Sequence, residues 1–124
     1  MAKRVLDVGQ CGPDHWAIES FLRRNFDCEL DQADGTDDTL AMVRSGSYDL
    51  VLVNRKLDID YSDGIDVIRA LKADPAVAAV PVMLVTNYPE HQEEAVAAGA
   101  IRGFGKLEFG KPETRDRVGA VLGA

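Results

Sequence analysis

The strongest constraint on the fold is that two short segments in the middle of the chain are apolar on both faces. Residues 49–54 (DLVLVN) and 81–86 (PVMLVT) carry almost unbroken apolar runs instead of alternating apolar and polar residues. Strands of a parallel sheet that is covered by helices on both faces show this pattern, whereas strands with one face in water alternate. The two segments therefore predict central strands of a parallel sheet.

Strand-like and helix-like segments alternate along the whole chain. We predict strands over residues 4–8, 28–33, 49–54, 81–86 and 101–105, and helices over residues 13–26, 36–46, 65–73, 89–98 and 112–122. The first helix carries Trp16, Ile18, Phe21 and Leu22 at helical spacing, and Thr36 is the predicted cap of the second. Five strand-then-helix units predict one α/β domain over residues 1–124, with a parallel sheet and helices on both faces.

Charge and hydropathy exclude several classes of partner. The net charge is −7, and because an acidic surface repels phosphate backbones, we expect no direct contact with nucleic acid. The apolar runs are short and broken by charge, and the first residues (MAKRV) do not form a signal peptide, so we expect no membrane association and a cytoplasmic location. Cys11, Cys28, His15 and His91 stand in separate segments without metal-ligand or disulfide spacing, and we interpret them as core or surface residues.

In parallel α/β sheets, functional sites form at the carboxyl ends of the strands, near the point where the strand order switches. Six residues of this chain stand at or just after the predicted strand ends and are therefore the candidates for a functional site. They are Gly9, Gln10, Asn54, Thr86, Asn87 and Lys106.

At these strand ends the chain resembles the response-regulator receiver domains of two-component and phosphorelay signalling. The resemblance covers nearly the whole chain and rests on the order and spacing of several motifs. They are YDLVLVN at 48–54, Asp63-Gly64 before a helix, PVMLVT at 81–86, AGA at 98–100, and Lys106. The resemblance implies a flavodoxin-like fold, with a five-stranded parallel sheet in the order 2-1-3-4-5.

The resemblance also implies five functional positions, and this chain has lost the acid at three of them. In the family, two acids end the first strand and help to hold Mg²⁺, and an aspartate at the end of the third strand accepts the phosphoryl group. Those positions are Gly9, Gln10 and Asn54 here. The hydroxyl and the lysine that contact the phosphoryl oxygens in the family are matched by Thr86 and Lys106.

The losses have a chemical consequence. Mg²⁺ releases its waters reluctantly and needs carboxylates or phosphates to hold it, and a neutral amide is a poor nucleophile for phosphoryl transfer. We therefore expect no Mg²⁺ or other cofactor, no catalytic residue and no enzymatic activity. The chain is interpreted as a degenerate receiver, or pseudo-receiver, that signals by protein–protein binding without phosphorylation. The expected partner is another protein, either a histidine kinase or an output domain.

Other departures and alternatives stay open from the sequence. The loop between Asn54 and Gly64 is longer than is usual in the family, and Gly103 stands where the family has its switch aromatic. An acid of that loop could act as a displaced phosphoacceptor, or the same strand ends could bind a small ligand. The candidate displaced acids are Asp58, Asp60 and Asp63.

Two further assignments remain undecided from the sequence. Asp7 either pairs with Lys106 or is peripheral, and Lys111, which precedes a proline, is the alternative to Lys106 as the family lysine.

Receivers commonly contact partners through the fourth helix, fifth strand and fifth helix. We predict a partner surface there, with an exposed aromatic anchor and a charged rim. Its residues are Glu90, Glu93, Arg102, Phe104 and Arg115.

Overall fold

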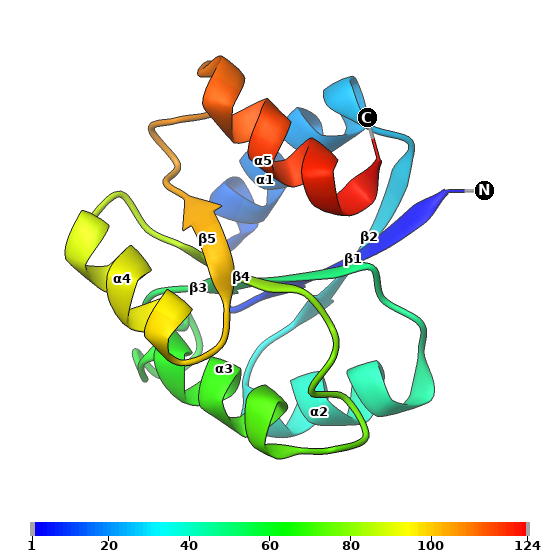
Figure 1. Cartoon of the computed structure of the whole chain (residues 1–124), viewed down its shortest axis with the longest axis vertical. Coiled ribbons are helices and arrows are strands. Elements are labelled where there is room, and N and C mark those ends of the chain that lie inside the picture. The colour runs from blue at the N-terminus through cyan, green and yellow to red at the C-terminus, as the bar shows by residue number, and fades with distance from the viewer. Residues whose placement is uncertain (1, 124) are drawn as a thin grey trace.

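The computed structural model describes residues 2–123, in which five strands alternate with five helices (Figure 1). The strands are β1 (Lys3–Val8), β2 (Cys28–Ala33), β3 (Leu50–Asn54), β4 (Val82–Val85) and β5 (Ile101–Phe104). The helices are α1 (Gly12–Asn25), α2 (Thr36–Ser45), α3 (Gly64–Ala73), α4 (Pro89–Ala97) and α5 (Pro112–Leu122). All neighbouring strands pair in parallel, in the order β2-β1-β3-β4-β5. The predicted fold class is therefore confirmed.

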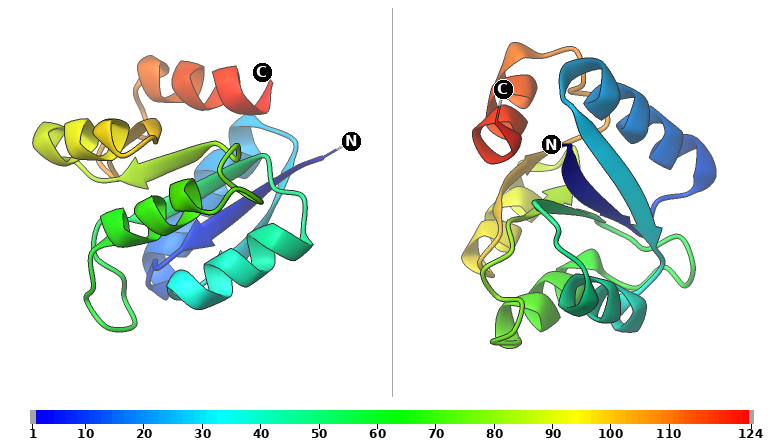
Figure 2. Two further views of the ribbon diagram at one scale, coloured as in Figure 1. Left: turned by 60° about the horizontal axis from the view of Figure 1, so that its bottom comes forward. Right: turned by 90° about the vertical axis from the view of Figure 1, so that its right-hand side faces the viewer.

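The sheet lies between two helical layers, with α1 and α5 on one face and α2, α3 and α4 on the other (Figure 2). Successive residues of a strand point to opposite faces. In β3, Leu50 and Leu52 therefore join the core under α1 and α5, while Val51 and Val53 join the core on the opposite face. Within the described residues, no helix is long and apolar enough to cross a membrane.

One apolar residue of α1 lies outside the core, and one local prediction about the helices was wrong. Trp16 is 68% exposed, because it lies two positions before Ile18 and a residue two positions away on a helix faces another direction. Thr36 does not cap α2. The cap position is Gly35, and the carboxylate of Asp38 accepts hydrogen bonds from the backbone N–H groups of Asp34 and Gly35 at 2.7 and 2.8 Å.

Candidate functional site

A small pocket opens at the carboxyl ends of β3, β4 and β5. Its volume is about 150 Å³. Asn54, Thr86 and Lys106 come together here, as the strand-end argument predicted. The complete lining consists of Asn54, Arg55, Lys56, Val85, Thr86, Asn87, Tyr88 and Lys106. No carboxylate is among these residues.

Both polar atoms of the Asn54 side chain form hydrogen bonds. Its Nδ2 donates to the carbonyl oxygens of Gly9 at 3.2 Å and Lys56 at 2.7 Å. Its Oδ1 accepts a hydrogen bond from Nζ of Lys106 at 3.4 Å. An amide suits this position because its NH₂ group donates to two carbonyl oxygens. A carboxylate only accepts hydrogen bonds, so its oxygens would lie against both carbonyl oxygens without a hydrogen between them.

Gly9 has a steric reason to carry no side chain. Its φ is +77°, a region that side chains disfavour, and a Cβ there would lie 2.4 Å from Cδ2 of Leu57. Leu57 is buried. The long loop after β3 is tied to this point, because the backbone N–H of Asp58 donates to the Gly9 carbonyl at 2.9 Å. Leu57 therefore occupies space that an acid at position 9 would need.

Gln10, at the other position of the family's acidic pair, is turned into the protein. It is only 9% exposed, and neither Oε1 nor Nε2 has a hydrogen-bond partner within the described part of the chain. It is also not among the residues that line the strand-end pocket.

These donors do not fit the magnesium ion that the receiver fold implies. The strand ends offer Gly9, Asn54 and the inward-turned Gln10 in place of three carboxylates, and Mg²⁺ at protein sites is held by carboxylates and phosphates. In residues 2–123, no group of three or more His, Cys, Asp or Glu side chains could hold a metal ion. The side chains at the strand ends therefore lack the carboxylates that a magnesium site needs.

Asp14, a residue that the sequence did not single out, supplies a carboxylate beside the site. It lies in the first turn of α1, and its Oδ2 is 2.7 Å from Nζ of Lys106. The hydrogen bond from Lys106 holds the pKa of Asp14 below its usual value. Lys111 is not at the site, since it is an exposed residue at the start of α5 whose Nζ lies 3.6 Å from Glu108. The sequence signal for Asp14 was its place in the first turn of the predicted helix over residues 13–26.

Asp7 makes a buried ion pair that the sequence did not reveal. It is 1% exposed, and its Oδ2 lies 2.6 Å from Nδ1 of His15. Its other oxygen, Oδ1, has no hydrogen-bond partner among the described residues. Burial raises the pKa of Asp7 to about 6, against the opposing influence of His15. The sequence-based alternatives were wrong, because Asp7 is central and its ion-pair partner is His15 rather than Lys106.

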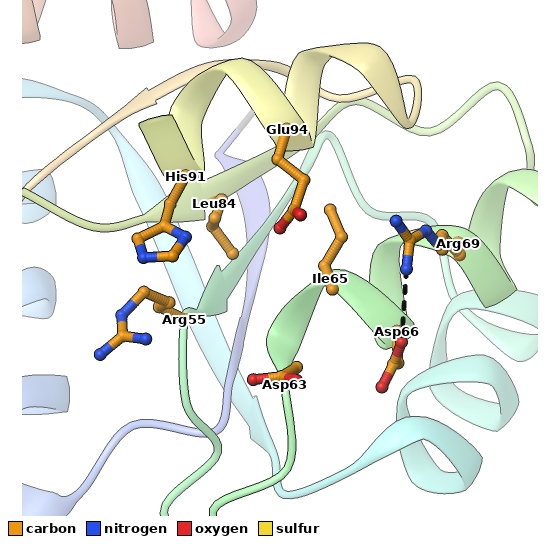
Figure 3. Close-up of a pocket in the computed structure, with 8 residues that line it drawn as sticks. All are labelled: Arg55, Asp63, Ile65, Asp66, Arg69, Leu84, His91 and Glu94. Atoms are coloured by element: carbon orange, nitrogen blue, oxygen red, sulfur yellow. Dashed lines mark ion pairs between the residues drawn. The ribbon is translucent and has the colours of Figure 1, made fainter. Parts of the chain in front are cut away.

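The three candidate displaced acids are exposed and lie outside the strand-end pocket. Asp60 accepts hydrogen bonds from the backbone N–H and the hydroxyl of Ser62 at 2.9 and 2.6 Å. Asp63 forms an ion pair with Lys56 and borders a second cavity, of about 300 Å³, between α3 and α4 (Figure 3). No hydrogen bond or ion pair in the described structure joins Asp58, Asp60 or Asp63 to Lys106 or Thr86.

The predicted partner surface is only partly exposed. Phe104 was expected to be an exposed anchor, but it is 0% exposed. Its ring packs in the core, with centroids 5.9 Å from both Phe21 and Phe109. Phe104 joins the core under α1 and α5, and the register of β5 against β4 shifts before it, since Met83 pairs with Ile101 but Val85 with Phe104. The other predicted surface residues, Glu90, Glu93, Arg102 and Arg115, are exposed.

Position 103 has no room for the family's switch aromatic. A Cβ on Gly103 would lie 2.3 Å from the carbonyl oxygen of Leu84. Its backbone N–H donates to Oε1 of the buried Gln92 at 2.8 Å. The glycine is therefore required by the close approach of β5 to β4.

The architecture is that of response-regulator receiver domains. The receiver domain of a DNA-binding response regulator from Colwellia psychrerythraea superposes with a TM-score of 0.78, at 18% identity, and the match covers 98% of this chain and 99% of that one. The receiver domain of a sensor histidine kinase from Pseudomonas aeruginosa gives a TM-score of 0.72 at 18% identity, with full coverage of both chains. That structure has a magnesium ion coordinated in its active-site cleft.

Sequence comparison gives a curated relative of known name. The chain is 30% identical over 109 residues to a gliding motility regulatory protein of Myxococcus xanthus. The match covers 86% of this chain but only 14% of the relative's length. No family model matches the chain.

Proposed function

We propose that this chain is a receiver-like module of two-component or phosphorelay signalling that works without phosphorylation, by binding another protein. The observation that carries the proposal is the amide of Asn54, which stands where the fold would place a phosphoacceptor. The receiver architecture and the likeness to a regulatory protein of Myxococcus xanthus support a role in signalling.

The chemistry of the strand ends supports independence from phosphorylation. The lone pair of the Asn54 nitrogen is delocalised into its carbonyl group, and both its hydrogens are donated to backbone carbonyls. Lys106 already has a carboxylate partner in Asp14. Because no covalent phosphoryl charge would shift the population of states, binding to the partner should be constitutive.

The partner is proposed to be a histidine kinase or an output domain. The exposed charges of both signs on α4, β5 and α5 remain the proposed contact surface, without Phe104. Such a surface would use Arg102 and Arg115 against acids of the partner, with Glu90 and Glu93 at the rim.

The proposal is tested by incubating the chain with acetyl phosphate and Mg²⁺ and measuring its intact mass. We expect no gain in mass. Restoring phosphorylation should take at least Asn54→Asp together with Gln10→Asp, because both the nucleophile and the metal ligands must be supplied.

A phosphoryl gain on the unmodified chain would contradict the proposal. If that gain disappeared in Asp60→Asn, or in the matching variants of Asp58 or Asp63, a displaced phosphoacceptor in the loop would replace it. A partner captured from cell extract should bind equally before and after acetyl phosphate treatment, and Arg102→Glu should weaken the complex.

A further inference from the structure

The cavity between α3 and α4, called the α3–α4 cavity below, lies outside the strand-end site (Figure 3). Its volume of about 300 Å³ is at the lower end of the range for small-molecule sites. It shares Arg55 with the strand-end pocket but no other residue, and none of the five family positions lines it. The lining consists of Arg55, Asp63, Ile65, Asp66, Arg69, Leu84, His91 and Glu94. A ligand of this cavity would therefore be independent of the phosphoryl chemistry of the family.

The α3–α4 cavity combines a buried apolar part with charges of both signs. Ile65 of α3 and Leu84 of β4 are its apolar members, and they are 8% and 1% exposed. The remaining groups are two guanidinium groups, one imidazole and three carboxylates. A ligand with a single charge would be repelled by the groups of its own sign, whereas a ligand that carries one charge of each sign can be matched at both.

Some of these charged groups already have partners. Asp63 is paired with Lys56, and Asp66 lies 3.7 Å from Arg69 on the same helix. Glu94 forms no ion pair and no side-chain hydrogen bond within residues 2–123. Arg55 has no ion pair in that range either, and its guanidinium contacts only the ring of Tyr88. Arg55 and Glu94 are therefore two groups of opposite charge that are free to bind a ligand.

The two free charges stand at different places in the cavity. In Figure 3 the carboxylate of Glu94 points from α4 toward Ile65, and the ring of His91, one turn earlier on α4, points toward Arg55. The rings of His91 and Tyr88 meet edge to face with their centroids 5.7 Å apart, and Cζ of Arg55 is also 5.7 Å from the Tyr88 ring. A guanidinium has only donors, and an imidazole has at least one N–H. The cavity therefore has a donor end at Arg55 and His91 and an acceptor end at Glu94.

Backbone contacts hold both sides of the cavity in place. The buried Gln92 of α4 donates from Nε2 to the Leu84 carbonyl at 2.9 Å and accepts at Oε1 from the backbone N–H of Gly103 at 2.8 Å. On the other side, the backbone N–H of Gly64 at the start of α3 donates to the Arg55 carbonyl at 2.8 Å. A preformed cavity binds a small ligand at a lower cost in conformational entropy.

We propose that the α3–α4 cavity binds a small zwitterion, a free amino acid with an aliphatic side chain. The ammonium group of the ligand donates to the Glu94 carboxylate, and its carboxylate accepts hydrogen bonds from the guanidinium of Arg55. The aliphatic side chain packs against Ile65 and Leu84. The cavity corresponds to about ten waters at about 30 Å³ each, which leaves room for such a molecule. This inference goes beyond the proposed function and does not depend on it.

The experiment is a calorimetric titration of the whole chain with L-leucine at neutral pH. Two analogues each lack one charge, since leucinamide has no carboxylate and isocaproate has no ammonium group. We expect saturable binding of one leucine. Either analogue should bind about tenfold more weakly, the effect of losing one charge-assisted hydrogen bond.

Three variants assign the two charges to their partners. Glu94→Gln should weaken the binding of leucine about tenfold but not that of isocaproate, which has no ammonium group. Arg55→Gln should weaken the binding of leucine about tenfold but not that of leucinamide. Glu93→Gln is the matched control, because it removes the same charge from the neighbouring exposed position of α4, outside the cavity. It should leave the affinity for leucine unchanged.

Absence of saturable leucine binding to the wild type would overturn the inference. Equal affinities for leucine, leucinamide and isocaproate would do the same, as would a loss in Glu93→Gln as large as that in Glu94→Gln. Circular dichroism of each variant shows whether it is folded. If Arg55→Gln were unfolded, Glu94→Gln and the two analogues would still decide the question.

Discussion

Asp7 on β1 and His15 on α1 form an ion pair 2.6 Å long between the sheet and the first helix. The carboxylate is almost completely buried and one of its oxygens has no partner among the described residues. Burying a charged carboxylate costs free energy unless a partner compensates for it. We therefore expect the free energy of unfolding to depend on pH and on the side chains of both Asp7 and His15.

The first prediction concerns pH. The pKa of Asp7 rises from 3.8 to about 6 on folding, so the native state holds this proton more tightly than the unfolded state. The resulting cost is absent below pH 3.8 and is fully developed above pH 6. Asp7→Asn removes it, and we expect the stability of the variant relative to wild type to be about 1 kcal/mol more favourable at pH 8 than at pH 5. Urea unfolding at both pH values measures this, and an equal difference at both would refute it.

The second prediction concerns the other member of the pair. His15→Ala leaves the Asp7 carboxylate buried without its partner, so we expect a loss of about 2 kcal/mol at pH 7. In the Asp7→Asn background the same change should cost clearly less, because no buried charge is left unpaired. A double-mutant cycle by urea unfolding measures the coupling, and additive effects would show that the ion pair contributes nothing.

The third prediction concerns Gly9 and Leu57. Gly9→Asp places a side chain at φ +77° and against the buried Leu57, so we expect a loss of about 2 kcal/mol from strain and overpacking. Gly110→Asp is the matched control, because a Cβ there meets nothing within 4 Å. Thermal unfolding of both variants checks this. Equal midpoints would mean that the loop after β3 yields freely to a side chain at position 9.

The fourth prediction concerns Phe104. Because its ring is fully buried, Phe104→Ala should cost about 3–5 kcal/mol of stability. Arg102→Glu, on the exposed part of the same strand, should change stability by less than about 0.5 kcal/mol. Urea unfolding separates the two. A small effect of Phe104→Ala would argue against the packing of this ring with Phe21 and Phe109.

Local sequence patterns determined the architecture of this protein. The apolar runs within 49–54 and 81–86, with helical segments between strands, predicted a parallel sheet covered on both faces. This inference succeeds because strand burial and the connection between parallel strands leave few alternatives. The strand-end rule also brought Asn54, Thr86 and Lys106 together correctly, since parallel strands end at one edge of the sheet.

Tertiary structure decided which side chains meet around those strand ends. Asp14 and Lys106 are 92 positions apart, and no periodicity within one helix tells which distant lysine an acid will reach. Pairing across β1 and α1 likewise requires the packing of a helix against the sheet, which is why the partner of Asp7 was missed. The exposure of Trp16 depends on the final rotation of α1, and the burial of Phe104 on the register shift of β5 against β4. The sequence alone determined the layers of the fold and the edge of the sheet at which the site lies. The balance of charge at that site follows from contacts that form only when the helices pack against the sheet.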